Sequence, residues 1–175
     1  MPQATTYSAA ELLADGRRIE IRALRPDDRT DLIEAVERSS SQSLYRRFLG
    51  AKRHFSEQEI AFFTNVDFVN HVALVAIIKE EDRPIIIAGG RYVVWQPGKA
   101  EVAFVVIDSY QGRGVGTALM RHLVAIAREA GLRELTAEVL SDNNPMLKVF
   151  EKSGLRLNRK PEGAVTHLVL ELNEG

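Results

Sequence analysis

The stretch EVAFVVIDSYQGRGVGT, residues 101–117, decides the fold of this 175-residue chain. Its first half is almost entirely apolar, which predicts a buried strand, and glycines follow at positions 112, 114 and 116. Beyond them, apolar residues recur at helical spacing until Gly131 ends the pattern; they are Val115, Leu119, Leu123, Ile126 and Ala127. The stretch therefore predicts a strand that passes through a glycine-rich turn into a helix.

The glycine-rich turn is suited to binding an anion. Without Cβ atoms, several backbone N–H groups can converge at the helix start, where the helix dipole attracts each anionic group by about 0.3–1 kcal/mol. No Lys-Ser or Lys-Thr follows, as a nucleotide-binding P-loop requires, and the dinucleotide fingerprint needs a third glycine where Thr117 stands. The turn predicts a phosphate cradle, although the glycines by themselves are also compatible with a turn that binds nothing.

The elements around this stretch predict a mixed fold. Residues 19–24 alternate as a strand does, and apolar runs at 72–78, 85–95 and 102–107 predict an antiparallel meander, in which Gly89-Gly90 marks a bulge or a close backbone approach. A strand at 135–140, a short helix at 145–152 and a last strand at 165–172 follow. Helix starts are indicated near Pro26 and Ser56. We expect an α/β (α+β mixed) fold with a mostly antiparallel mixed sheet of about six to seven strands and about four helices.

Composition narrows the function classes. Hydrophobic residues are 45% and charged residues 27%, and 23 Lys plus Arg against 24 Asp plus Glu leave a net charge of -1, so we expect neither a nucleic-acid nor a membrane partner. Cysteine is absent, and His54, His71, His122 and His167 lack metal-ligand spacing, so we expect no metal. No signal peptide or spanning run is present, which predicts a cytoplasmic protein. We divide it into an N-terminal tail, 1–18, and one domain, 19–175.

The glycine-rich turn and several other segments resemble those of a known family. Gln111-Gly112-Arg113-Gly114-Val115-Gly116 is similar to the Q/R-x-x-G-x-G/A signature of the GNAT superfamily, the Gcn5-related N-acetyltransferases. Ile21-Arg22 with Pro26-Asp27-Asp28 resembles the family's opening strand and helix, and residues 143–154 resemble its second motif. Residues 43–48 and 64–67 resemble bacterial protein lysine acetyltransferases that modify acyl-CoA synthetases. The resemblance implies a GNAT fold and acetyl-CoA as the acetyl donor.

The resemblance also assigns residues to the donor. It implies that main-chain amides of the glycine loop bind the pyrophosphate of acetyl-CoA; the loop residues are Gln111, Gly112, Arg113, Gly114, Gly116 and Thr117. Phe104, Val105 and Val106 would pair with the pantetheine arm and offer an N–H to the thioester oxygen, a role compatible with a plain buried strand. Asn143 would lie beside the cofactor, whereas Asn144, before Pro145, reads as a helix N-cap.

Glu101 is the candidate general base. An amine with a pKa near 10.4 is almost entirely protonated at neutral pH, so acetyl transfer needs a proton acceptor. We expect burial to raise the pKa of the Glu101 carboxylate toward the useful range, and the position matches the catalytic glutamate of relatives. The alternative role is an exposed glutamate paired across strands with Lys99 or Arg91.

The general acid is not assigned. Phe150 stands where many relatives have a tyrosine, so either the thiolate leaves unassisted or Tyr45 or Tyr110 donates the proton.

The sequence supports three functions. We expect direct acetyl transfer in a ternary complex, because no cysteine can carry the acetyl group, to an amine such as a protein lysine side chain, for example on an acyl-CoA synthetase. The alternatives are a small-molecule amine acetyltransferase and a catalytically weak acyl-CoA-binding regulatory module. A homodimer stays open. The basic residues Arg46, Arg47, Lys52 and Arg53 form either a solvated loop or a patch for an acidic protein or for the adenosine phosphate of CoA.

Overall fold

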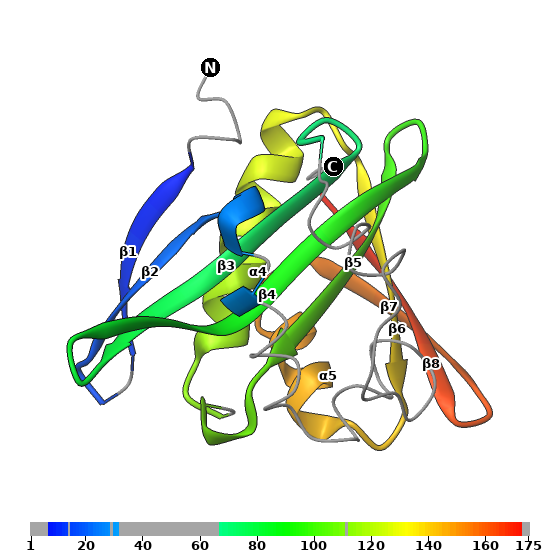
Figure 1. Ribbon diagram of the computed structural model, residues 1–175. Helices are drawn as coiled ribbons and strands as arrows, with labels where there is room; N and C mark the ends of the chain where they lie inside the picture. Colours follow the sequence, from blue (N-terminus) through cyan, green and yellow to red (C-terminus); the bar gives the residue numbers. More distant parts are fainter. Residues whose placement is uncertain (1–6, 14, 29, 32–66, 111, 173–175) are drawn as a thin grey trace.

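A computed structural model describes residues 7–13, 15–28, 30–31, 67–110 and 112–172 of the chain (Figure 1). Eight of its segments pair in one sheet, in the order β1-β2-β3-β4-β5-β6-β8-β7. The strands are β1 (Ser8–Leu12), β2 (Arg18–Ala23), β3 (His71–Glu80), β4 (Arg83–Gln96), β5 (Lys99–Val106), β6 (Glu134–Leu140), β7 (Arg156–Glu162) and β8 (Val165–Glu171). All neighbouring pairs are antiparallel except β5 with β6, so the predicted mixed, mostly antiparallel sheet is confirmed.

The described residues also form two α-helices and two short 3-10 helices. These are α4 (Val115–Glu129), α5 (Asn144–Glu151), η2 (Pro26–Asp28) and η3 (Asp108–Tyr110). The predicted helices after residue 114 and around 145–152 are thus confirmed, whereas the helix start near Ser56 lies outside the described residues. No helix in the part of the chain that is described is long and apolar enough to span a bilayer.

Two strands were not expected from the sequence. Residues 8–12, which we placed in an N-terminal tail, form β1 and pair with β2 along their whole length. β7 pairs with β8 from Arg156 to Glu162 and is exposed along almost its whole length. The sheet therefore has eight strands rather than the expected six to seven.

The predicted meander is formed by β3, β4 and β5. A register shift lies between Ala76 and Ile77, which pair with Ala88 and Ile86, so the irregularity falls at Ile87 and not at Gly89-Gly90. Gly90 instead allows a close approach: a Cβ built there would lie 2.7 Å from Cδ1 of Phe104. Of the two expectations for Gly89-Gly90, the close approach is therefore correct and the bulge is not.

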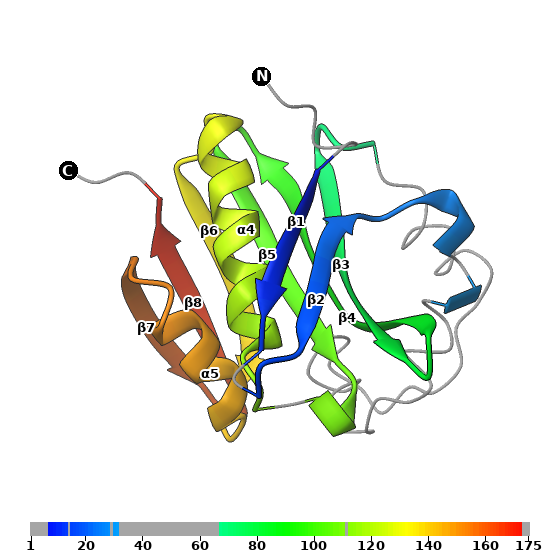
Figure 2. The same cartoon turned by 90° about the vertical axis from the view of Figure 1, so that its left-hand side faces the viewer.

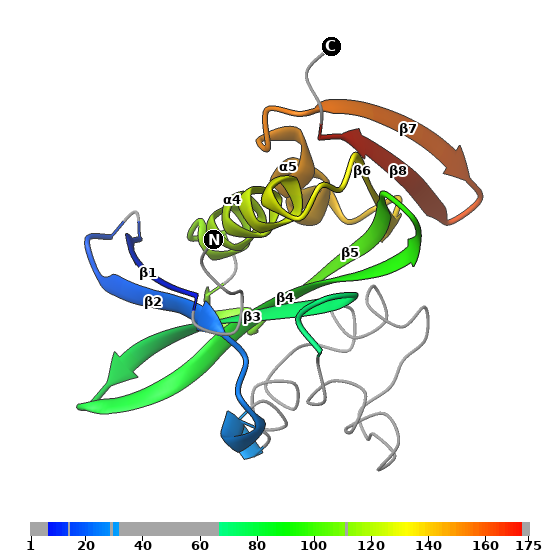
Figure 3. The ribbon, with the colours of Figure 1, turned by 90° about the horizontal axis from the view of Figure 1, so that it is seen from above.

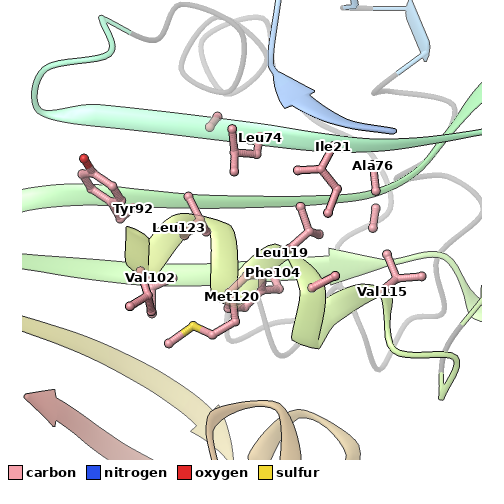
Figure 4. Close-up of a cluster of buried hydrophobic side chains, with 14 of the residues drawn as sticks. Ile21, Leu74, Ala76, Tyr92, Val102, Phe104, Val115, Leu119, Met120 and Leu123 are labelled. Carbon is pink, nitrogen blue, oxygen red and sulfur yellow. The ribbon is translucent and has the colours of Figure 1, made fainter. Parts of the chain in front are cut away.

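The core lies between α4 and the sheet (Figure 4). Leu119 and Leu123 of α4 are fully buried and face Leu74 and Tyr92 of the central strands, whereas Met120, also buried, points away from them. Burying a side chain of this size contributes about 1.5–3 kcal/mol, so this apolar face explains why α4 packs where it does. Figure 2 shows α4 lying across the strands, with its beginning at the end of the molecule where β1 turns into β2.

The sheet splits between β5 and β6, the only parallel pair among the described strands. β5 and β6 pair at just three positions, Lys99 with Glu134, Ala100 with Leu135 and Glu101 with Thr136, and no pairing of the two described strands follows. Seen from above, the two halves of the sheet curve around α4 and α5 (Figure 3). The carboxyl half of β5 therefore borders a gap, which lies next to the beginning of both helices.

Candidate active site

A cavity of about 400 Å³ opens at the end of β5, between the beginnings of α4 and α5. It brings together eight of the residues predicted to bind the donor: Phe104, Val105, Val106, Gly112, Gly114, Gly116, Thr117 and Asn143. Its volume lies within the usual range of roughly 300–1,000 Å³ for a ligand site. Of the two remaining predicted residues, Arg113 is not among the residues that line the cavity, and Gln111 lies outside the described residues.

The glycine loop brings backbone N–H groups of its described residues to this cavity. Gly112 and Gly114 have φ angles of +75° and +91°, which side chains rarely adopt, so the turn requires glycine. Gly114 is the N-cap of α4, and no side chain caps the helix or adds an acidic group to its first turn. The N–H groups at the start of α4 are left without intrahelical acceptors and suit an anion.

Two lysines add positive charge on the opposite wall, and sequence reasoning missed both. Lys148 of α5 and Lys152, its C-cap, line the cavity four residues apart, which places them on one side of the helix. The signal for them was present, since α5 begins directly after the predicted cofactor residue Asn143. Their charges favour an anionic ligand over a neutral one.

Asn143 is fully buried and uses only half of its side-chain amide. Its Oδ1 accepts a hydrogen bond from the Met146 N–H at 3.1 Å, which makes Asn143, and not the expected Asn144, the N-cap of α5. Its Nδ2 is buried without a hydrogen-bond partner among the described residues. A buried donor left unpaired costs about 1–3 kcal/mol, so this atom fits a ligand that brings an acceptor into the cavity.

β5 offers a further backbone donor toward the gap. The Ile107 N–H donates to the Ile87 carbonyl of β4 at 2.9 Å. Because N–H groups alternate sides along a strand, that of Phe104 points the other way, where β6 no longer pairs. The N–H of Phe104 thus faces the cavity side of β5, as the predicted oxyanion donor requires.

Glu101 lies at the last paired position of β5 with β6. Its neighbours Ala100 and Val102 are buried in the core, so Glu101 projects from the face of the sheet opposite α4, where its side chain is exposed. The expected burial of this carboxylate is therefore wrong. The exposure that the alternative role requires is present, but among the described residues the Lys99 Nζ lies near Glu134, at 3.7 Å, and forms no ion pair with Glu101.

The position at which many relatives have a tyrosine carries no proton donor in the second motif. Phe150 is buried and packs against Phe104, with 5.8 Å between ring centroids. Tyr110 lines the cavity, but its hydroxyl donates to Glu80 Oε1 at 3.1 Å. Tyr45 and the basic residues 46–53 lie outside the described residues.

The fold and the cavity define a protein with a candidate anion site at a helix start, and the comparisons specify the family. Residues 38–155 match the model of the acetyltransferase (GNAT) family. The chain is 31% identical over 153 residues to acetyltransferase PA5475 of Pseudomonas aeruginosa, covering 87% of this chain and 82% of the relative. It is 33% identical over 147 residues to acetyltransferase Pat of Mycolicibacterium smegmatis, covering 83% of this chain but only 43% of that longer relative.

A solved structure agrees with these relatives. The GNAT domain of Streptomyces lividans PAT superposes with a TM-score of 0.84 at 37% identity, covering 94% of this chain and 96% of that one. The protein belongs to the GNAT family of acetyltransferases, which draw their acetyl group from acetyl-CoA. Within that family it is similar to the Pat proteins named above.

Proposed function

We propose that the protein transfers the acetyl group of acetyl-CoA directly to the side-chain amine of a protein lysine, with Glu101 as the general base. The observation that carries this proposal is that one cavity is lined both by the glycine loop and by Phe104, Val105 and Val106 of β5, the strand that also bears Glu101. One end suits the phosphates of the donor, and the other end reaches the strand on which Glu101 lies. The resemblance of residues 43–48 and 64–67 to bacterial protein lysine acetyltransferases supports a protein acceptor.

The donor would be held by groups already pointing into the cavity. The N–H groups at the start of α4, together with Lys148 and Lys152, would bind the phosphates. The Nδ2 of Asn143 would donate to a carbonyl oxygen of the pantetheine arm, which satisfies the unpaired amide. The arm would then run along Phe104, Val105 and Val106 toward the gap.

The transfer needs few groups. The neutral amine attacks the thioester carbon, the new N–C bond forms, and the Phe104 N–H stabilises the oxyanion before the C–S bond breaks. Glu101 lies three residues from Phe104, about 10 Å along the strand, so the amine proton would reach its carboxylate through a chain of water molecules. The leaving thiolate needs no acid, since a thiol pKa near 8.5 makes it a fair leaving group and Phe150 has no proton to give.

The substitution Glu101→Gln tests the base. We expect turnover to fall by about 10²–10⁴-fold, because the amide cannot accept the proton, while acetyl-CoA still binds normally. Acetylation of candidate proteins and amines, followed by mass spectrometry, measures the rate, and calorimetry measures donor binding. Glu134→Gln is the matched control, because Glu134 lies on the neighbouring strand and pairs with Lys99. Near-normal turnover of Glu101→Gln would show that Glu101 is not the general base.

A second candidate is an acyl-CoA-binding regulatory module with little activity. The buried Phe150, in the place of a proton donor, favours it. The same assay separates the candidates, because a module of this kind binds acetyl-CoA without acetylating any protein or amine. If the protein acetylates small amines but no protein, the proposed donor site stands and the acceptor is a small-molecule amine.

A further inference from the structure

The turn between β1 and β2 contacts the segment that leads into the glycine loop. The turn is closed by hydrogen bonds of the Leu13 N–H to Arg17 and of the Gly16 N–H to Leu13, at 2.8 and 2.9 Å. Asp15 accepts bonds from both the backbone N–H and the Nε of Arg17, each at 3.0 Å. These bonds fix the direction in which the Arg17 side chain leaves the turn.

Arg17 reaches Tyr110, 93 residues further along the chain. Its Nη1 donates to the Tyr110 hydroxyl at 3.3 Å, and its guanidinium carbon lies 5.2 Å from the centre of the ring. The hydroxyl in turn donates to Glu80 at the end of β3. Tyr110 is only 4% exposed and lines the donor cavity, two residues before Gly112.

Arg113, inside the glycine loop, joins the same cluster. Its guanidinium carbon lies 5.6 Å from the centre of the Tyr110 ring, and its Nη1 pairs with Asp15 Oδ2 at 3.1 Å. Its Nε donates to the Ser109 carbonyl at 3.1 Å. The Tyr110 cluster, which consists of Asp15, Arg17, Glu80, Tyr110 and Arg113, thus connects three separate parts of the chain, and it reaches the cavity wall through Tyr110.

We infer that Arg17 is a positioning residue for acetyl-CoA binding, because it holds Tyr110 and the glycine loop in the conformation that receives the phosphates. The loop contains Gly112 and Gly114 at positive φ, and glycine leaves an unbound loop more conformational freedom than any other residue. Binding is weakened by the fraction of time that the loop spends in other conformations. An external contact that fixes the loop in advance therefore raises donor affinity. This inference rests on the proposed function.

A purely structural role for the turn predicts something different. In that case Arg17 only keeps β1 and β2 together at the edge of the sheet, and its loss lowers stability without affecting the donor. The chain offers a matched control, since Arg121 of α4 pairs with Glu11 of β1 at 2.7 Å. That pair also fastens β1 but does not touch the glycine loop.

The experiment compares Arg17→Lys with Arg121→Lys in the full chain. Both keep the charge and lose the planar guanidinium with its directed bonds. We expect Arg17→Lys to raise the KM and the Kd for acetyl-CoA about 5- to 20-fold with kcat changed less than about 2-fold, and Arg121→Lys to leave all three unchanged. Tyr110→Phe removes the shared hydroxyl, and its effect on Kd should not add to that of Arg17→Lys.

Hydrogen exchange of the ligand-free protein tests the positioning apart from the function. The amides of residues 112–117 should exchange faster in Arg17→Lys than in the wild type or in Arg121→Lys. If the wild type binds acetyl-CoA, the inference is overturned when Arg17→Lys has the same Kd as the wild type. It is also overturned when the loop amides of Arg17→Lys exchange at the wild-type rate. A wild type that does not bind acetyl-CoA overturns the proposed function, whatever the loop amides do.

Discussion

At the scale of single residues, Asn143 shows how one side chain serves structure and ligand together. Its oxygen caps α5 through the Met146 N–H, and the residue lines the cavity. The nitrogen is buried without a partner among the described residues. The protein therefore carries a local cost that a bound acceptor would remove, and in the proposed complex this would couple the start of α5 to the donor.

The two roles of Asn143 can be separated by Asn143→Ser. Serine caps a helix about as well as asparagine, so we expect the free energy of unfolding to change by less than about 1 kcal/mol. The amide donor is lost, and the Kd for acetyl-CoA should rise about 5- to 15-fold, as expected for one hydrogen bond of about 1–1.5 kcal/mol. Urea unfolding and calorimetry measure the two effects. An unchanged Kd would show that the Asn143 nitrogen does not contact the donor.

Single-residue roles were only partly accessible from the sequence. The glycine loop could be predicted because its residues are adjacent and their backbone requirement is local. The capping residue was misplaced by one position, since both Asn143 and Asn144 precede the helix and only the backbone decides between them. The exposure of Glu101 depends on which face of the sheet is covered, and a strand pattern alone does not specify this.

At the scale of elements, Gly90 determines how closely β4, β5 and α4 pack. A Cβ at position 90 would lie 2.7 and 2.8 Å from Cδ1 and Cε1 of Phe104 and 3.2 Å from Leu123. Phe104 also contacts Phe150 of α5 and lines the cavity. The missing side chain at Gly90 therefore fixes the position of a ring that belongs to the site.

Gly90→Ala should displace that ring. We expect a destabilisation of about 1–3 kcal/mol, typical of an overpacked core, together with weaker acetyl-CoA binding. Gly89→Ala is the matched control, because its Cβ would lie 3.7 Å from the nearest atom, an ordinary contact. Urea unfolding of both variants measures the difference. Equal stabilities would mean that Phe104 moves aside without cost.

Elements were predictable where their pattern is local. Helix α4 and the β3–β4–β5 meander follow from apolar spacing within a single segment. β1 reads SAAEL and β7 reads RLNRKPE, and neither has the apolar alternation of a buried strand. Both lie at the edges of the sheet, where one neighbour supplies the pairing, so their partners and not their own residues make them strands.

At the scale of the whole molecule, an ion pair between β2 and η2 makes stability depend on pH. Arg22 donates to both carboxylate oxygens of Asp28 at 2.8 Å, and both side chains are largely buried. Burial alone would raise the pKa of Asp28, but the hydrogen bonds from Arg22 and from the Arg25 N–H outweigh it and lower the pKa. The folded state therefore favours the charged carboxylate.

Asp28→Asn should lower the free energy of unfolding by about 2 kcal/mol at neutral pH, because Arg22 loses its charged partner. A lowered pKa contributes stability above the ordinary aspartate value of about 3.9 and loses it as the pH falls toward the folded value. The difference between wild type and variant should therefore shrink below about pH 4. Urea unfolding measured from pH 7 to pH 3 gives this curve. If the difference in the free energy of unfolding stays constant over this pH range, the destabilisation does not depend on ionisation of Asp28.

The short pairing between β5 and β6 has a consequence for the protein without its ligand. Three residue pairs and the crossover helix α4 join two groups of strands that otherwise hardly pair. A molecule bound in the cavity would contact β5 of one group and α5, which connects β6 to β7 in the other group, and would so bridge the break in the ladder. Its binding free energy then also resists separation of the two halves, by about 2.7 kcal/mol when the ligand is present at a hundred times its Kd. The concentration of that ligand in the cell would therefore change how strongly the two halves of the sheet are held together.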